Sequence, residues 1–124
     1  RSIHDFKQLS KEEQGALLEW LVAGELWRRL IFENFRHADS IGFWKSDKHE
    51  IDFVVRGNEF FEVKLGKSSA LEFSWFPKVF PGKKLTVICS TPFEAEWVRG
   101  IDVHTFLLEG PCPDFIKEWQ MPFQ

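Results

Sequence analysis

The sequence predicts an α/β fold in which a mixed five-stranded β-sheet is flanked by helices. Three observations lead to this prediction. A long helical pattern opens the chain, apolar residues alternate with period 2 in segment 49–65, and a continuous apolar run occupies residues 85–89. Alternation indicates a strand with one face in a core, whereas an uninterrupted apolar run indicates a buried central strand. The 124 residues are enough for one domain with a sizeable core.

The first helix is predicted to run from Ser10 to about Phe35. Ser10 and Glu13 form an S-x-x-E capping box, and apolar residues then recur around much of the helix. Glu19 shares one side of this helix with small and apolar residues such as Leu26. If it is buried there, its carboxylate must be paired, protonated or bound to a metal. The alternative is a partly exposed glutamate at the edge of the buried face.

Segment 49–65, HEIDFVVRGNEFFEVKL, predicts a β-hairpin. Odd positions on both arms are apolar and even positions are mostly polar, so the polar groups are expected on one face. A Gly-Asn pair supplies the turn, but a two-residue turn would mix the two faces. A three-residue loop, or a bulge beside the turn, is therefore predicted. In that register Val54 lies opposite Glu62, and Asp52 lies opposite Lys64.

The remaining elements follow in chain order, and the first three strands are expected to form an antiparallel meander, with later strands added through crossovers. These elements are a strand at Ile41–Trp44, a short helix that starts at a second S-x-x-E box (Ser69–Glu72) and ends at Pro77, a turn at Pro81-Gly82, a central strand at Leu85–Cys89, a helical turn within Pro92–Arg99, and a last strand at Ile101–Leu108. Residues 1–108 are expected to form one domain. Residues 109–124, with three prolines, are expected to form a tail that wraps the surface or joins an interface, and the absence of an initiator Met suggests a fragment of a longer protein.

The hairpin carries the candidate catalytic groups. Mg²⁺ prefers oxygen ligands, which Asp52, Glu62 and the backbone carbonyl of Val63 could supply. Bound Mg²⁺ or Mn²⁺ would lower the pKa of its water and neutralise charge on a phosphate. Lys64 would orient the attacking water and stabilise the transition state. Alternatively, Asp52 and Glu62 form ordinary ion pairs with Lys64 on a solvated sheet face. Glu50 has the parity of the same face and is a secondary candidate.

Asp52 followed by Glu62-x-Lys64 resembles the PD-(D/E)XK motif of restriction-endonuclease-like nucleases, with Ile51 in place of the motif's proline. The wider order G-x-x-x-E on a helix, then FW, EIDFV and EVK, is similar to a nuclease-like domain at the C-terminus of many archaeal and bacterial AAA-type ATPases. The likeness covers roughly residues 12–108. It implies a restriction-endonuclease-like sandwich and an upstream ATPase domain as partner. The active-site set that it implies is Glu19, Asp52, Glu62 and Lys64, with Glu19 as a direct or water-mediated metal ligand.

Charge and composition limit the partners. The net charge of −3 argues against tight free-standing nucleic-acid binding. A basic run, defined here as Lys64, Lys67, Lys78, Lys83 and Lys84, is interpreted as either a phosphate track or a solvated face. Glu25, with arginines at i+3 and i+4, predicts a surface ion pair. No apolar run approaches membrane-spanning length, so no membrane partner is expected, and two unpatterned cysteines, with Cys89 expected to be buried, fit a reducing cytoplasm.

Together these observations predict a domain for Mg²⁺-dependent phosphodiester hydrolysis in nucleic acid, with DNA favoured over RNA. Two alternatives stay open. One is a non-catalytic module of the same fold that serves the ATPase through protein contacts, and the other is a nucleic-acid-binding domain without chemistry. The complete acidic set with its lysine favours chemistry. The acidic net charge and the aromatic content, 14 Phe and 6 Trp, favour a dependent module.

Overall fold

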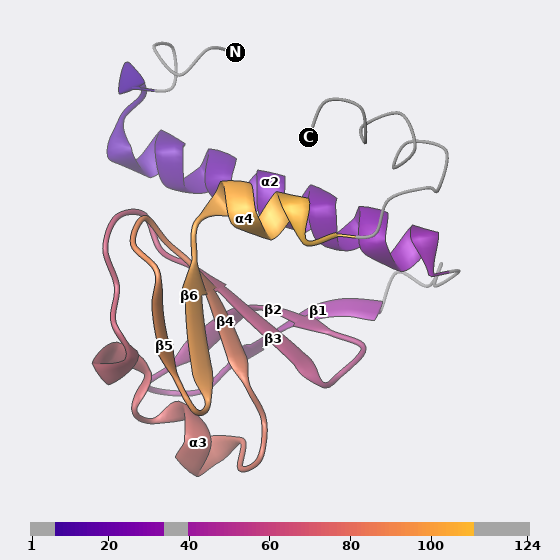
Figure 1. The fold of residues 1–124 in the computed structure, drawn as a ribbon, viewed down its shortest axis with the longest axis vertical. Coiled ribbons are helices and arrows are strands. Elements are labelled where there is room, and N and C mark those ends of the chain that lie inside the picture. Colours follow the sequence, from indigo (N-terminus) through magenta and orange to yellow (C-terminus); the bar gives the residue numbers. More distant parts are fainter. Residues whose placement is uncertain (1–6, 34–39, 111–124) are drawn as a thin grey trace, which may run out of the picture.

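A computed structural model describes residues 7–33 and 40–110 and shows an α/β fold (Figure 1). Its mixed sheet has six strands in the order β1-β2-β3-β4-β6-β5, one more than predicted, and is flanked by helices. The strands are β1 (Ile41–Lys45), β2 (Glu50–Val55), β3 (Glu59–Val63), β4 (Leu85–Ile88), β5 (Phe93–Ala95) and β6 (Val98–Ile101). The helices are α2 (Lys11–Phe32), the 3₁₀ helix η2 (Ala70–Phe73), α3 (Phe76–Val79) and α4 (Val103–Leu108).

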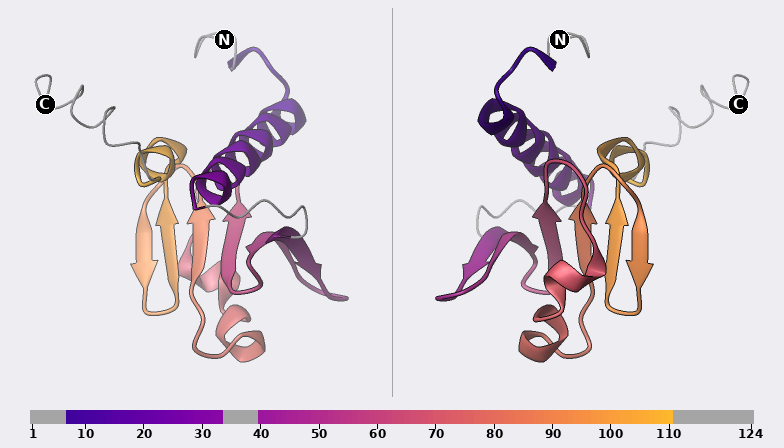
Figure 2. Two further views of the ribbon diagram at one scale, coloured as in Figure 1. Left: turned by 90° about the vertical axis from the view of Figure 1, so that its right-hand side faces the viewer. Right: turned by 90° about the vertical axis from the view of Figure 1, so that its left-hand side faces the viewer.

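The sheet joins an antiparallel meander to a parallel centre. Strands β1, β2 and β3 pair antiparallel, as predicted, and β4 and β6 then add in parallel to β3. The crossover from β3 to β4 contains η2 and α3, and β5 closes the far edge antiparallel to β6. In Figures 1 and 2, α2 and α4 lie near one end of β3, β4 and β6, and α3 lies near the opposite end. The apolar run at 85–88 is a central strand, as the sequence indicated.

Helix α2 begins where its capping box predicts. The Ser10 hydroxyl accepts from the Glu13 amide at 3.1 Å, and the Glu13 carboxylate accepts from the Ser10 amide at 3.1 Å. This exchange satisfies two amides that a helix otherwise leaves without an intrahelical acceptor. The helix ends at Phe32, slightly before the predicted position. Its buried side presents Val22, Leu26 and Leu30 to the sheet.

Both faces of the sheet are covered, each by its own apolar cluster. The helix-side cluster consists of Val22, Leu26, Leu30, Val55, Phe61, Ile88, Ile101 and Phe106. The far-side cluster consists of Ile51, Phe60, Phe73, Phe76, Leu85, Val87, Cys89 and Val98. Because the second cluster packs η2 and α3 against the sheet, the hairpin has no solvated face of the kind that its polar residues suggested. Among the described helices, none combines the length and the apolar character needed to cross a membrane.

The hairpin has the predicted three-residue loop but a different register. The loop is Arg56–Asn58, and Val54 lies opposite Phe60, not opposite Glu62 as predicted. Continued by two residues, this register sets Asp52 level with Glu62 and not with Lys64. The loop starts one residue earlier than expected because Arg56 adopts a positive φ of 54°, a conformation usually left to glycine or asparagine. The alternation of polar and apolar residues is the same in both registers, so it could not distinguish them.

A bulge interrupts β2 at the residues that carry the proposed chemistry. Gly42 pairs with Val54 and Trp44 pairs with Ile51, so one β1 residue faces two β2 residues, Asp52 and Phe53. The extra residue reverses the alternation. Ile51 consequently packs in the far-side cluster, although Phe53, two positions on, packs against the helix-side cluster. The prediction that all odd positions of this arm share one face was therefore wrong at Ile51.

Three predicted elements in the second half of the chain were also wrong. Pro77 lies in the first turn of α3 and does not end a helix, which agrees with its fixed φ and missing amide hydrogen. Residues 92–99 contain β5 and the start of β6 and no helical turn. Residues 103–108 form α4 and not a strand, because the Asp102 carboxylate accepts from the Thr105 amide at 2.7 Å and caps a helix there.

Candidate active site

Asp52 and Glu62 meet where β2 and β3 separate. The paired register of these strands ends at Phe53 and Phe61, although β2 continues back to Glu50. Beyond that point side chains bridge the gap. The Asp52 amide donates to Glu62 Oε1 at 3.0 Å, and the Val63 amide donates to Asp52 Oδ2 at 2.8 Å. Each carboxylate thus holds the backbone of the opposite strand, which fixes both acids at one end of the hairpin.

Burial gives Glu62 the most perturbed ionisation in the described part of the chain. Only 7% of the residue is exposed, since β3 is an inner strand with both faces covered. The pKa of Glu62 is raised to about 8, first by burial and then by hydrogen bonding and charge from the Asp52 carboxyl. The nearby Lys64 ammonium opposes this rise. At neutral pH the Glu62 carboxyl therefore retains its proton.

Glu19 faces the same group of acids from α2. Its pKa is raised by partial desolvation, then by the negative charges of Asp52 and Glu50. Those two charges reach Glu19 because α2 packs against the sheet through Val22, Leu26 and Leu30. The structure thus brings Glu19 into electrostatic contact with the hairpin acids, although its side chain remains exposed. Glu50, the secondary candidate from parity, belongs to this group as well.

Lys64 and Val63 follow directly after Glu62. The Lys64 amide donates to the Ile88 carbonyl at 2.9 Å, which holds this residue beside the end of β4. Its ammonium lies 5.9 Å from the centre of the Phe73 ring and lowers the pKa of Glu62 by its charge. In the described part of the chain, Lys64 forms no ion pair with Asp52 or Glu62, so the alternative of ordinary ion pairs on a solvated sheet face was wrong. Val63 contacts Asp52 through its amide, and its carbonyl remains a predicted ligand.

The donor set suits a hard divalent cation in type. Asp52, Glu62, Glu19 and the Val63 carbonyl offer only oxygen, the ligand atom that Mg²⁺ and Mn²⁺ prefer. Burial is the main cause of the raised pKa values of Glu62 and Glu19, and a cation placed among these groups would offset the repulsion between carboxylates that adds to it. However, no cluster of three or more His, Cys, Asp or Glu side chains is already arranged to hold a metal within residues 7–33 and 40–110. In this structure one oxygen of each hairpin carboxylate is engaged by a backbone amide.

The basic run is divided between the two ends of the sheet. Lys64 follows the carboxyl end of β3, and Lys67 lies in the next loop. Lys84 precedes β4, whose first residue pairs with Phe60 at the opposite end of β3. Lys78 lies in α3, at that opposite end in Figure 1. The run therefore forms no continuous phosphate track beside the candidate acids.

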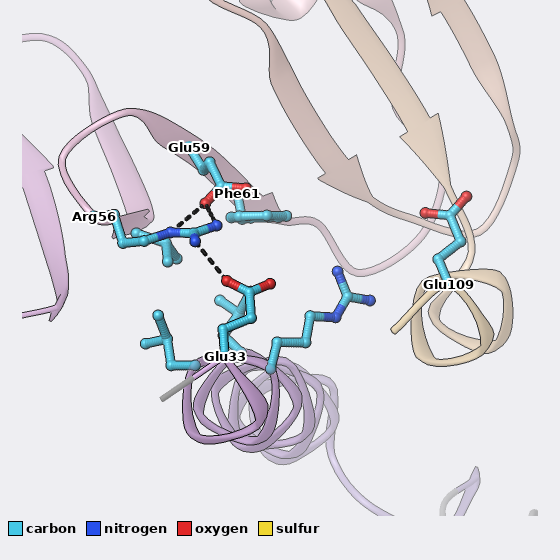
Figure 3. A pocket seen from close by; sticks show the side chains of 9 residues that line it. Glu33, Arg56, Glu59, Phe61 and Glu109 are labelled. Atoms are coloured by element: carbon cyan, nitrogen blue, oxygen red, sulfur yellow. Dashed lines mark hydrogen bonds and ion pairs between the residues drawn. The ribbon is translucent and has the colours of Figure 1, made fainter. Parts of the chain in front are cut away.

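A second group of charges, near the hairpin loop, holds α2 and the sheet together (Figure 3). Arg56 bonds to Glu33 at 2.5 Å and to Glu59 at 2.9 Å, at the rim of a pocket of about 190 Å³. Glu109, on the far side of that pocket, pairs with Arg99 at 2.9 Å. Glu25 is likewise paired with Arg28 and Arg29, but it is buried and not at the surface as predicted. These pairs are structural, because each carboxylate is already matched by an arginine.

Sequence reasoning missed one feature beside the site, an apolar hollow at the carboxyl ends of β3, β4 and β6. Its signal is that three apolar strands are each followed directly by small or polar residues, but only the parallel pairing brings those ends together. Cys89, buried as predicted, also lines it. In the comparisons with known proteins, no family model, no curated protein and no solved structure matches this chain.

Proposed function

We propose that this chain is a nuclease-like domain that hydrolyses phosphodiester bonds in nucleic acid with the help of Mg²⁺ or Mn²⁺. DNA is the favoured substrate, and the fold is assigned to the restriction-endonuclease-like class. The resemblance of Asp52 and Glu62-x-Lys64 to the PD-(D/E)XK motif supports this function. The resemblance also suggests an ATPase domain as the natural partner of this domain in the full-length protein.

The observation that carries the proposal is the pair of carboxyl groups held across the separating strands β2 and β3. Because Glu62 is buried in contact with the Asp52 carboxyl, its pKa is raised to about 8 and its ionisation destabilises the folded protein. Perturbed pKa values concentrate at functional sites, so this arrangement supports a functional role for the two acids. A β-bulge beside the pair supports the same interpretation, because bulges often re-aim side chains next to active sites.

Each residue has a distinct part in the proposed reaction. Asp52, Glu62 and the Val63 carbonyl would hold the cation, and Glu19 would act on it directly or through water. The metal supplies an acidic bound water and charge neutralisation at the phosphate. Lys64 offers its ammonium to the phosphate oxygens or to the attacking water. Its backbone is fixed by the bond to Ile88, so its side chain starts from a defined position beside Glu62.

Metal-dependent stabilisation tests the proposal directly. Millimolar Mg²⁺ or Mn²⁺ is expected to raise the melting temperature of the chain, since a ligand that binds only the folded state stabilises it. Asp52→Ala should abolish that rise. Asp47→Ala, in the exposed turn before β2, removes the same charge away from the acids and should leave the rise intact. A plasmid-nicking assay with Glu62→Ala and Lys64→Ala then tests turnover. An unchanged melting temperature at millimolar metal would contradict the proposal.

A second candidate, a non-catalytic module that serves an ATPase, is favoured by exposed apolar side chains. Trp20 is 70% exposed and Phe43 is 75% exposed, and exposed aromatic residues are enriched in protein interfaces. If the domain is such a module, Trp20→Ser and Phe43→Ser should leave the melting temperature unchanged but reduce coupling to the ATPase domain in the full-length protein. Unchanged coupling would count against the module, and metal-dependent cleavage would favour the first candidate.

A further inference from the structure

An apolar hollow of about 220 Å³, the strand-end hollow, opens beside the candidate acids. It lies at the carboxyl ends of three neighbouring parallel strands, β3, β4 and β6. Ile88 of β4 and Leu65 of the loop after β3 line it, together with Val103 of α4 and Leu18 of α2. In open sheets with parallel strands, ligands bind outside the carboxyl ends of the strands, so the hollow is in the expected place for a ligand.

The hollow and the candidate active site share a wall. Lys64 belongs to both, because it lines the hollow and follows Glu62 by two residues at the end of β3. Leu18 is the neighbour of Glu19 in α2. A molecule held at the acids by its phosphate would therefore have its next chemical group over this apolar surface. Among the described residues that line the hollow, Asp102 alone carries a carboxylate, and it is engaged by the Thr105 amide as the cap of α4.

We propose that the strand-end hollow receives an unpaired nucleoside adjoining the phosphate that is cut. This inference rests on the proposed function and specifies its substrate as a single-stranded or locally unpaired nucleic acid. The aliphatic lining suits the faces of a base and its sugar, and the Lys64 ammonium suits the phosphate beside them. Few polar side chains line the hollow to read base edges, so recognition is independent of sequence.

Two features favour an unpaired strand over a duplex. A base must leave its stack before it can enter a pocket, and this costs least where the strand is already single. Duplex binding depends on many cationic contacts to phosphate, but the basic run is divided between opposite ends of the sheet. Only Lys64 and Lys67 of that run are near the hollow, and the chain carries a net charge of −3. The site therefore suits a short contact with a single strand and not an extended contact with a duplex.

Binding measured without cleavage tests this inference. The parent protein is Asp52→Asn, which keeps an oxygen for the Val63 amide while disabling the proposed chemistry. Fluorescence anisotropy compares a short labelled DNA strand with its blunt duplex. Leu65→Ala removes part of the lining, and Ser90→Leu fills the hollow from an exposed position. Leu71→Ala and Ser74→Leu make the same changes at exposed positions of η2 and its C-cap, outside the hollow.

The single strand is expected to bind about tenfold more tightly than the duplex. Leu65→Ala and Ser90→Leu should each weaken single-strand binding about fivefold, the change expected for losing or blocking a small apolar contact. The two control variants should bind as the parent does. Equal binding of strand and duplex, or full binding by Leu65→Ala and Ser90→Leu with unchanged melting temperatures, would overturn the inference.

A parallel cleavage assay separates this inference from the proposed function. If protein with the native Asp52 never cuts DNA with Mg²⁺, but binding responds to the hollow variants as expected, the proposed chemistry fails and the nucleoside site stands. If the protein cuts and Ser90→Leu cuts at the same rate with the same substrate affinity, the chemistry stands and the nucleoside site fails.

Discussion

Glu62 shows how one side chain links the fold to the candidate chemistry. It is buried on an inner strand, and its pKa is raised from 4.5 to about 8. Below pH 4.5 the carboxyl is protonated in both the folded and the unfolded chain, so its burial does not lower the free energy of unfolding. Between pH 4.5 and 8 the unfolded chain releases the proton while the folded chain keeps it, so the free energy of unfolding falls as pH rises. Above pH 8 the carboxyl is ionised in both states, and the free energy of unfolding is lowered by the full cost of burying its charge.

Replacing Glu62 by glutamine should therefore stabilise the protein in a pH-dependent manner. The glutamine side chain would keep an oxygen for the Asp52 amide but would carry no charge to desolvate. We expect Glu62→Gln to raise the free energy of unfolding by on the order of 1–3 kcal/mol at pH 8 and by little near pH 4.5. Urea denaturation at the two pH values measures this difference. Glu94→Gln, at an exposed position of β5, is the matched control, and an equal effect of Glu62→Gln at both pH values would contradict the expected ionisation.

The candidate residues could be named from the sequence, but their environment could not. Asp52, Glu62 and Lys64 stand in a recognisable order along the chain, and the structure holds the first two in mutual contact. The burial of Glu62 depends on η2 and α3 covering the second face of the sheet. Alternation in a single hairpin reports that one face is apolar, but it cannot report what a distant segment places over the other face.

At the scale of elements, the two S-x-x-E boxes form a natural comparison. Ser10 and Glu13 exchange hydrogen bonds at the start of α2. Ser69 makes no side-chain capping bond, and the segment after it is a single 3₁₀ turn. The same four-residue pattern therefore caps a long helix at one position and caps nothing at the other. The difference arises because α2 continues for 22 residues with a buried side, whereas η2 stops after four.

This contrast predicts different costs for the same substitution. Ser10→Ala should lower the free energy of unfolding by about 1 kcal/mol, since it removes an N-cap acceptor and one half of the box. Ser69→Ala should change it by less than about 0.5 kcal/mol, the usual range for a surface substitution that breaks no specific contact. Thermal melting of both variants measures the difference. A loss at Ser69 as large as that at Ser10 would show that the serine contributes outside the capping pattern.

The elements after Ser90 show where local sequence patterns are no longer sufficient to predict the secondary structure. Segment 101–108 contains enough β-branched and aromatic residues to suggest a strand. The structure divides it at Asp102, whose side chain caps α4 and so ends β6 at Ile101. Asp is a recognised N-cap residue, so that signal was present in the sequence. By contrast, the short edge strand β5 depends on pairing with β6 and carries little signal of its own.

The molecule as a whole is organised around four strands, β2, β3, β4 and β6, that contribute to both clusters. Phe60 packs in the far-side cluster and Phe61 in the helix-side cluster. Val87 and Ile88 of β4 divide in the same way. Adjacent residues of one strand point to opposite faces, so neither cluster can lose its packing without disturbing the backbone that supports the other. The candidate active site lies at the end of one of these shared strands and depends on both layers.

The shared strands predict that the two layers unfold together. Phe106→Ala empties part of the helix-side cluster and Phe76→Ala part of the far-side cluster, and each should lower the free energy of unfolding by about 3–5 kcal/mol. Of the described tryptophans, Trp44, Trp75 and Trp97 pack against the far-side cluster and Trp27 packs against the helix-side cluster, so tryptophan fluorescence weights the far side, whereas far-UV circular dichroism follows mainly α2. In either variant the two signals should change at one denaturant midpoint, as a two-state transition requires. Separate midpoints, with the signal of the mutated side lost first, would mean that β3 and β4 can hold one layer without the other.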